Sequence, residues 1–189
     1  MSHFKTLVFT KTGDEDEIYE LLAPYDENIE NNDRARWDWW SFGGRFAYDL
    51  RLKELDEDGE PMEANHAKFS HLLIDDDPQA DKENGRFWDE YVEGSNRDSD
   101  EYANVFFKPE YYKEQYGTKE RFLRICGDDL MPQAFVDPEG EWHEQGTMGW
   151  FACSDATPET IDNFFDEWED MCKRAAEEDL YVTIVDCHI

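Results

Sequence analysis

The pattern of apolar and polar positions predicts strands at the two ends of the chain and a long helix before the last strand. Residues 4–10 form an apolar, partly alternating run, and residues 181–189 are apolar on both faces, as in a central strand. Residues 158–179 carry one apolar stripe at helical spacing. Thr157 and Pro158 are residue types that favour the start of a helix, so we expect it to begin there.

The segments before this helix predict further strands. Residues 135–143 indicate a hairpin, because Asp137, Pro138 and Gly140 occupy favoured positions of a type I turn. Residues 148–153 predict a strand that the long helix would connect to the last one. We therefore predict an α+β fold with a single mixed β-sheet, helices packed on one face, and a C-terminal β-α-β unit.

One part of the chain gives few structural signals. Residues 56–104 contain the runs DEDGEPME, IDDDPQADKENG and EGSNRDSDE, which are rich in acidic and turn-forming residues. Only the Phe87, Trp88 and Tyr91 patch shows helical spacing there. We predict a single domain over residues 1–189, with residues 56–104 as an acidic, loop-rich insertion within it.

Composition adds a large excess of negative charge. The chain has 48 Asp and Glu against 18 Lys and Arg, a net charge of −30 over 189 residues. Aromatic residues make up 15 %, which argues against a disordered acidic chain and for a folded core. A surface of this sign repels nucleic acid and acidic membranes and attracts basic proteins. We expect a basic protein partner, no direct binding to nucleic acid and no membrane association.

The remaining composition favours a reducing compartment. No apolar stretch approaches the ~18 residues of a membrane span, and the start MSHFKTLVFT lacks the pattern of a signal peptide. The four cysteines are widely spaced and form no CxxC pair, so we expect free thiols. We predict a cytoplasmic protein without a cofactor or a metal centre.

Four groups of residues resemble a known set of proteins. They are Trp37-Asp38-Trp39-Trp40 with Gly43-Gly44-Arg45; the YGTKE run at 116–120; GEWH at 140–143 with MGW at 148–150; and the terminal VDCHI. Together they are similar to uncharacterised proteins encoded by tailed bacteriophages and prophages. The resemblance covers both ends of the chain but not its acidic middle. It implies expression inside a bacterial host cell, and it implies no mechanism.

The acidic side chains supply one candidate functional surface. On the 158–179 helix they recur every few ångströms, as phosphates do along nucleic acid. They could meet the Lys and Arg side chains of a DNA-binding groove, or they could simply keep this face soluble. The predicted partner-binding residues are Asp162, Asp166, Glu169, Asp170, Glu54, Asp56, Glu57, Asp58, Asp75, Asp76 and Asp77.

A second set of residues predicts a ligand pocket. Asp186 and His188 lie two apart on the last strand and should point to one face. Gly43 and Gly44 would let the backbone approach an anion that Arg45 holds, and tryptophan rings can stack on a base. The alternative is a hydrogen-bonded polar pair and a glycine turn beside an aromatic core. The predicted pocket consists of Trp37, Asp38, Trp39, Arg45, His143, Asp186 and His188.

Three functions follow from these features. The leading prediction is a non-enzymatic, phage-encoded acidic protein that inhibits a basic, nucleic-acid-binding host protein of antiviral defence by occupying its groove, much as a DNA mimic would. The first alternative is a protein that binds or hydrolyses a nucleotide signal in the predicted pocket. The second is an accessory phage protein whose acidic coat serves solubility.

Overall fold

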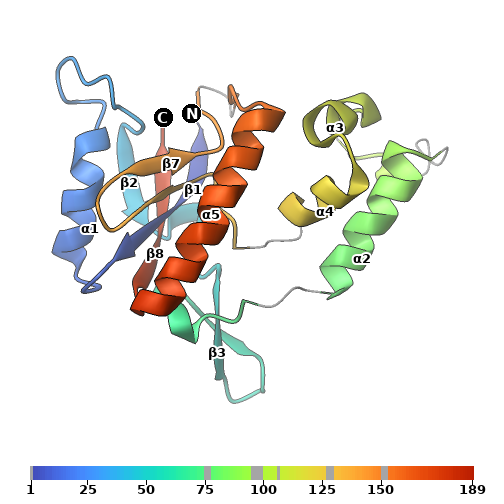
Figure 1. The fold of residues 1–189 in the computed structure, drawn as a ribbon. Helices are drawn as coiled ribbons and strands as arrows, with labels where there is room; N and C mark the ends of the chain where they lie inside the picture. Colours follow the sequence, from blue (N-terminus) through green and yellow to red (C-terminus); the bar gives the residue numbers. More distant parts are fainter. Residues whose placement is uncertain (1, 75–77, 95–99, 106, 127–129, 150–152) are drawn as a thin grey trace. The chain divides into compact units, whose positions relative to one another are not determined.

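The chain divides into two compact units in the computed structural model shown in Figure 1. Unit 1 comprises residues 1–74 and 130–189, and unit 2 comprises residues 75–129. The structure describes residues 2–74, 78–94, 100–105, 107–126, 130–149 and 153–189.

Unit 1 contains a six-stranded mixed sheet. Its strands are β1 (His3–Thr10), β2 (Trp39–Phe42), β5 (His66–Lys68), β6 (Ala134–Val136), β7 (Trp142–Glu144) and β8 (Tyr181–His188). The strand order is β2-β8-β1-β6-β7, and β5 also pairs with β8. β1 and β8 pair antiparallel along their whole length, so the two ends of the chain lie side by side (Figure 1).

The core of unit 1 lies on both faces of this sheet. Leu7 and Phe9 of β1 pack with the apolar stripe of α5 (Pro158–Glu178). Phe4 and Val8 point to the other face and pack with α1 (Glu15–Leu22). The α+β fold with a mixed sheet is confirmed. The helices, however, cover two faces and not one, because the central strands are apolar on both sides and each side must be buried.

The C-terminal β-α-β unit is present with a different first strand. β7 runs antiparallel to β6, β6 parallel to β1, and β1 antiparallel to β8, so β7 and β8 run in the same direction. α5 connects these two strands. The strand predicted over residues 148–153 is not seen: Met148 forms one isolated bridge with Ser154, and residues 150–152 lie outside the described residues.

α5 begins where its sequence predicts. Thr157 and Thr160 form a reciprocal capping box, in which the backbone N–H of Thr160 donates to Thr157 Oγ1 at 3.2 Å and that of Thr157 to Thr160 Oγ1 at 2.8 Å. The helix ends at Glu178 and is followed by the C-cap residue Asp179, whose φ of 53° lies in the left-handed region. The two caps fix where α5 begins and ends, and therefore how long its charged side is.

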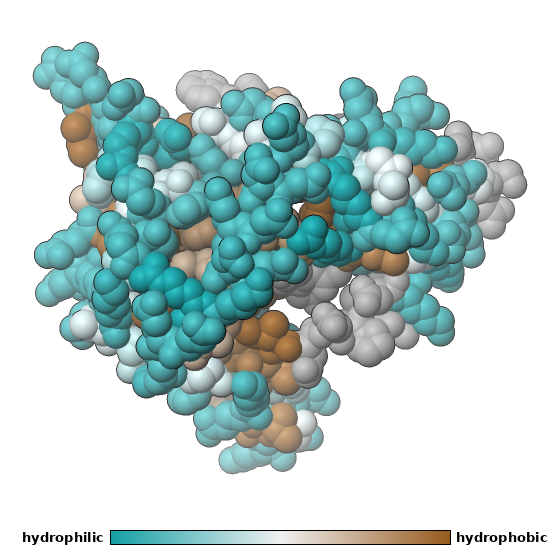
Figure 2. Space-filling view, in the orientation of Figure 1, coloured by the Kyte–Doolittle hydropathy of each residue, from teal (hydrophilic) through white to brown (hydrophobic). Residues whose placement is uncertain are grey.

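A separate hairpin extends from unit 1. β3 (Leu50–Leu55) and β4 (Pro61–Ala64) form a two-stranded sheet, and Leu52 of β3 also forms one isolated bridge with Leu72. Leu55 and Met62 are exposed on it. Figure 2 shows hydrophobic residues gathered over this hairpin, while most of the remaining visible surface of unit 1 is hydrophilic.

Unit 2 has an aromatic core of its own. It contains α2 (Pro78–Phe87), a π-helical turn over Trp88–Val92, α3 (Pro109–Tyr116) and α4 (Lys119–Cys126). Trp88, which is fully buried, packs against Phe122 with ring centroids 5.2 Å apart. Tyr91 and Tyr102 belong to the same cluster.

The predicted insertion 56–104 coincides with neither unit. Residues 56–74 belong to unit 1, because they complete the β3–β4 hairpin and supply β5. Residues 105–126 belong to unit 2, because α3 and α4 cover the rings that follow α2. Residues 56–104 also contain more helix than we predicted from their acidic, turn-rich sequence.

The fold predicts which face of α5 carries the stability of unit 1. Trp168 is 1 % exposed and packs on Phe9 and Phe135 of the sheet. Trp168→Ala should lower the free energy of unfolding by about 3–5 kcal/mol. Asn163→Ala, on the exposed side of the same helix, should change it by less than about 0.5 kcal/mol. Urea unfolding of both variants measures this difference, and equal losses would contradict the packing described for α5.

Candidate functional site

Three chain segments meet at one end of the sheet of unit 1. The strand register places His188 of β8 opposite His3 of β1 and opposite Trp39 of β2. Asp38 directly precedes β2, and Asp186 lies two residues before His188 and so points to the same face. We call these five residues the histidine–aspartate cluster. It contains four of the seven predicted pocket residues, and His3 in addition.

Asp186 is the buried centre of this cluster, only 2 % exposed. Its carboxylate accepts a hydrogen bond from the backbone N–H of Arg45 at 2.9 Å and lies 2.9 and 3.1 Å from Nδ1 of His3. Gly44 makes this approach possible, because its φ is +53° and a Cβ there would lie 2.3 Å from Asp186 Oδ2. The anion that meets the glycine turn is thus a side chain of the protein itself.

His188 is held in the same way by a second carboxylate. Its Nδ1 lies 2.6 Å from Oδ1 of Asp38, whose backbone N–H donates to the carbonyl of His188 at 2.9 Å. The indole of Trp39 stacks on the imidazole with centroids 4.8 Å apart and planes at 18°. The ring of His3 stands edge-on to both, 4.9 Å from His188 and 5.4 Å from Trp39. Two imidazoles therefore adjoin, each with a carboxylate at Nδ1.

This geometry leaves the two Nε2 atoms as the reactive positions. An ionised carboxylate only accepts hydrogen bonds, so each Nδ1 carries its proton. Within the described residues, no hydrogen bond reaches Nε2 of His3 or His188, and neither atom is among the fully buried polar atoms that lack a partner. Neither Nε2 atom is therefore fully enclosed, although His188 is only 4 % exposed and His3 is partly buried.

The cluster does not meet the needs of a metal centre. A carboxylate at Nδ1 is the usual support of a metal-binding histidine, so the two imidazoles have the right orientation for one. In the part of the chain that the structure describes, however, no three or more His, Cys, Asp and Glu side chains are grouped so that they could hold a metal ion. Two imidazoles alone leave a metal with too few protein ligands.

Two basic residues flank the cluster. Lys5 is paired with Asp186 in the register and lies on the same face, with its Nζ 3.8 Å from Oδ2 of Asp49. The side chain of Arg45 is exposed, and it forms no hydrogen bond or ion pair with another described residue. Arg45 can therefore turn toward a ligand at the cluster without giving up a contact.

Trp37 does not belong to the cluster, contrary to the prediction. It is 7 % exposed and lies in the core on the α1 face of the sheet, where Tyr25 is among its neighbours. Trp40 is partly buried against the same core. Alternation along β2 explains why Trp40 points away from His188 while Trp39 points toward it, but Trp37 precedes the strand and so does not follow its alternation.

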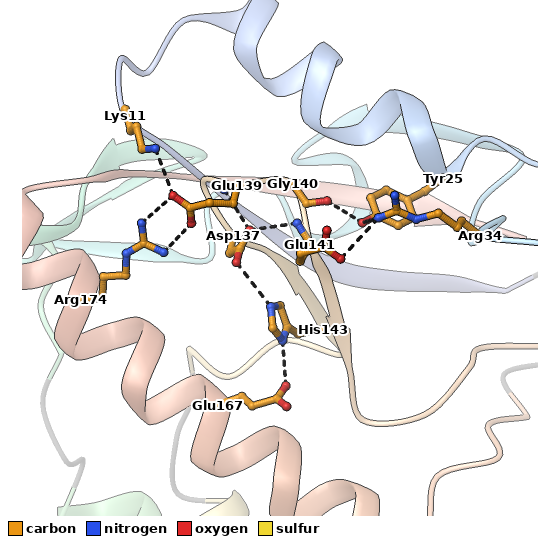
Figure 3. A network of polar contacts seen from close by, with 10 residues as sticks. All are labelled: Lys11, Tyr25, Arg34, Asp137, Glu139, Gly140, Glu141, His143, Glu167 and Arg174. Carbon is orange, nitrogen blue, oxygen red and sulfur yellow. Dashed lines mark hydrogen bonds and ion pairs between the residues drawn. The ribbon is translucent and has the colours of Figure 1, made fainter.

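His143 also lies away from the cluster. β1 and β6 separate its strand from β8 in the sheet. Its Nδ1 is 2.8 Å from Glu167 of α5 and its Nε2 is 3.7 Å from Asp137 (Figure 3). Its ring also stacks on Phe135, with centroids 4.4 Å apart. His143 thus links β7 to α5, and the sequence could not show that two strands would intervene.

The network around His143 continues to the turn between β6 and β7. The Glu139 carboxylate accepts hydrogen bonds from the guanidinium of Arg174 at 2.6 and 2.8 Å and from Nζ of Lys11 at 3.1 Å (Figure 3). Chiefly through the Arg174 bonds, the pKa of Glu139 falls from its usual 4.5 to about 2. This network holds the hairpin turn against α5 and β1.

The acidic residues predicted on α5 face outward. Asp166, Glu169 and Asp170 are exposed and Asp162 is partly exposed, whereas the apolar stripe of the same helix packs on the sheet. Asp170 forms an ion pair with Lys173 at 3.0 Å. Over its whole length α5 carries eight acidic and two basic residues.

The other predicted acidic residues lie elsewhere. Glu54 is exposed near the end of β3, and Asp56, Glu57 and Asp58 are exposed in the turn after it. Oδ1 of Asp56 accepts backbone N–H groups at 2.9 and 3.0 Å, so this carboxylate also shapes the turn. Residues 75–77 lie outside the described residues. α1, on the opposite face of the sheet, carries exposed acidic residues too, so the negative charge extends beyond α5.

His3 is the site residue that the sequence did not reveal. Asp186 and His188 share a strand, and their common face followed from a spacing of two. His3 stands 183 residues before Asp186, and only the pairing of the first strand with the last brings them together. Its position at the start of an alternating strand, two residues before Lys5, was the one available signal.

No family model, curated protein or solved structure matches this sequence. Among the described residues, no helix is long and apolar enough to cross a membrane. The function is therefore argued from the geometry of the cluster and of the acidic surface.

The contact between Gly44 and Asp186 predicts a local loss of stability. Gly44→Ala adds a Cβ that collides with the Asp186 carboxylate, and it strains the positive φ by about 1–2 kcal/mol. Gly59→Ala is the matched control, since its φ is +85° and nothing lies within 4 Å of the added Cβ. Urea unfolding should show a larger loss for Gly44→Ala by at least about 1 kcal/mol. Equal losses would show that the turn does not press on Asp186.

The low pKa of Glu139 predicts a pH-dependent contribution to stability. Because the pKa is about 2 in the folded protein and about 4.5 when the group is free, the contact stabilises the fold above pH 4.5 and is lost as the pH falls toward 2. Glu139 and Arg174 are partly exposed, so Glu139→Gln should remove less than about 1 kcal/mol at neutral pH. The difference from wild type should vanish near pH 2 in unfolding experiments, and a difference independent of pH would contradict the assignment.

Proposed function

We propose that this protein acts by binding, and that the outer face of α5 engages the basic groove of a nucleic-acid-binding protein. Binding there would exclude nucleic acid from the groove and so inhibit the partner. The observation that carries this proposal is that a single helix with one exposed side carries eight acidic and only two basic residues.

The spacing of charge along α5 supports a role as a substitute for phosphates. A helix of 21 residues is about 31 Å long, so its eight carboxylates average about one per 4 Å. A single strand of B-DNA presents one phosphate about every 3.4 Å. Arginine and lysine side chains that grip a phosphate backbone would therefore meet a row of anionic oxygens along this helix, in which Glu167, Asp170 and Glu178 also pair with His143, Lys173 and Arg174.

The net negative charge of the chain also supports binding to a basic partner, however the ion pairs are arranged. Even if every Lys and Arg paired with a different carboxylate, 30 carboxylates would remain. Packing them on one folded protein costs stability through mutual repulsion, which a basic partner would relieve on binding. Electrostatic attraction of this kind also speeds association and weakens steeply with salt.

The resemblance to phage-encoded proteins suggests the class of partner. Inside a bacterial cell, a basic protein whose inhibition benefits a phage is a nuclease or another nucleic-acid-binding component of antiviral defence. We propose a protein of that class as the target. The inhibition needs no chemical step by this protein.

The proposal predicts that α5 is required for capture of such proteins. The immobilised protein should retain basic, nucleic-acid-binding proteins from a bacterial lysate at low salt, release them at high salt, and release them when duplex DNA is added. A variant with four carboxylates of α5 changed to amides should capture at least about tenfold less. Its substitutions are Asp162→Asn, Asp166→Asn, Glu169→Gln and Asp170→Asn.

A control variant removes the same number of charges elsewhere. It changes four exposed acidic residues of α1 and the loop after it: Glu20→Gln, Glu27→Gln, Glu30→Gln and Asp33→Asn. This control should capture nearly as much as wild type. Equal losses in the two variants would show that general charge, and not α5, attracts the partners. Captured proteins that duplex DNA does not displace would contradict the proposal altogether.

A further inference from the structure

Binding by the acidic surface does not account for the histidine–aspartate cluster. Burying an ionised carboxylate is unfavourable unless it is fully paired, and an apolar packing of the same volume is often at least as stable. The protein nonetheless buries Asp186 and supports it with His3, the Arg45 backbone and a glycine turn. A second carboxylate, Asp38, orients His188 beside it. Stability alone does not explain so specific an arrangement.

The two Nε2 atoms point to an anionic ligand group. With its proton on Nδ1, a neutral ring offers Nε2 only as an acceptor, whereas a ring protonated on both nitrogens keeps its hydrogen bond to the carboxylate and donates outward from Nε2. It is this second form of the two rings that would bind an anion. The ring centroids lie 4.9 Å apart, so the two imidazoles are direct neighbours. Arg45, whose backbone N–H holds Asp186, adds an exposed guanidinium.

The indole beside these donors points to a flat aromatic ligand group. Trp39 is 44 % exposed although one side of its ring stacks on His188. Its remaining surface can receive a planar ring in the same orientation, and aromatic stacking of this kind accepts any base. A phosphate donor set and a free indole surface lie together at one end of the sheet.

We propose that the histidine–aspartate cluster is a nucleotide-binding site. The phosphate of a nucleoside phosphate contacts Nε2 of His3 and His188 and the guanidinium of Arg45, and its base stacks on Trp39. This site goes beyond the acidic-surface function and does not depend on it. The anionic coat opposes the approach of the nucleotide, so affinity comes from these short-range contacts and is modest.

The test separates the two halves of the ligand. Isothermal titration should show binding of AMP to the wild-type protein, and weaker binding of adenosine or of inorganic phosphate alone. Trp39→Ala should weaken AMP and adenosine alike by about tenfold, because both lose the stacking surface. Arg45→Gln should weaken AMP but leave adenosine unchanged, because only AMP carries the phosphate.

A matched control keeps the test specific. Tyr19→Ala removes another exposed ring, which is 54 % exposed and lies tilted against Trp40, with centroids 4.8 Å apart, on the opposite face of the sheet. It should leave AMP binding unchanged. Thermal unfolding of each variant confirms that it folds, and Trp39 and Arg45 are exposed enough to be replaced without loss of the core.

Three results would overturn the site. They are no binding of AMP, GMP, CMP or UMP at millimolar concentration, equal effects of Trp39→Ala and Tyr19→Ala, and tight Zn²⁺ binding that His3→Asn abolishes, which would make the cluster a metal site. None of these results bears on capture by α5. Conversely, loss of capture in the α5 variant leaves nucleotide binding untouched, so the two proposals fail separately.

Discussion

The antiparallel pairing of β1 with β8 is the constraint on which the rest of the structure depends. It joins eight residues at each end of the chain, from the pair His3 and His188 to the pair Thr10 and Tyr181. Because side chains alternate along a strand, a shift of one residue would exchange the α1 and α5 sides of the core. The same shift would turn His3 away from Asp186. One register therefore sets both the core and the histidine–aspartate cluster.

The two proposed surfaces follow from that register in different ways. Leu7, Ile184 and Asp186 share one face of the sheet, so the cluster lies at the end of the face that α5 covers. α5 needs only its apolar stripe to dock, which leaves its other side available for carboxylates. The cluster instead needs three strands and a glycine turn at fixed positions. A charged surface can bind a partner without exact positions for its side chains, whereas a ligand site requires them.

Sequence patterns correctly predicted the features that depend only on residues close together in the chain. The capped, periodic helix before the last strand was recognisable because its signals lie within about six turns of chain. The shared face of Asp186 and His188 needed only alternation. His3, Trp37 and His143 depended on which strands become neighbours, which no local pattern contains. Unit 2 was obscured in a similar way, since acidic runs between Phe87 and Phe122 concealed rings that pack only in three dimensions.

The most direct test of this account is the protonation of the two imidazoles, measured by long-range ¹H–¹⁵N NMR at a pH where both rings are neutral. The pairing of β1 with β8 and the carboxylates at Nδ1 require that His3 and His188 carry the proton on Nδ1, the minor tautomer of a free histidine. Nuclear Overhauser contacts between the two rings should accompany it. Both rings protonated at Nε2, with no contact between them, would contradict the strand register and the site built on it.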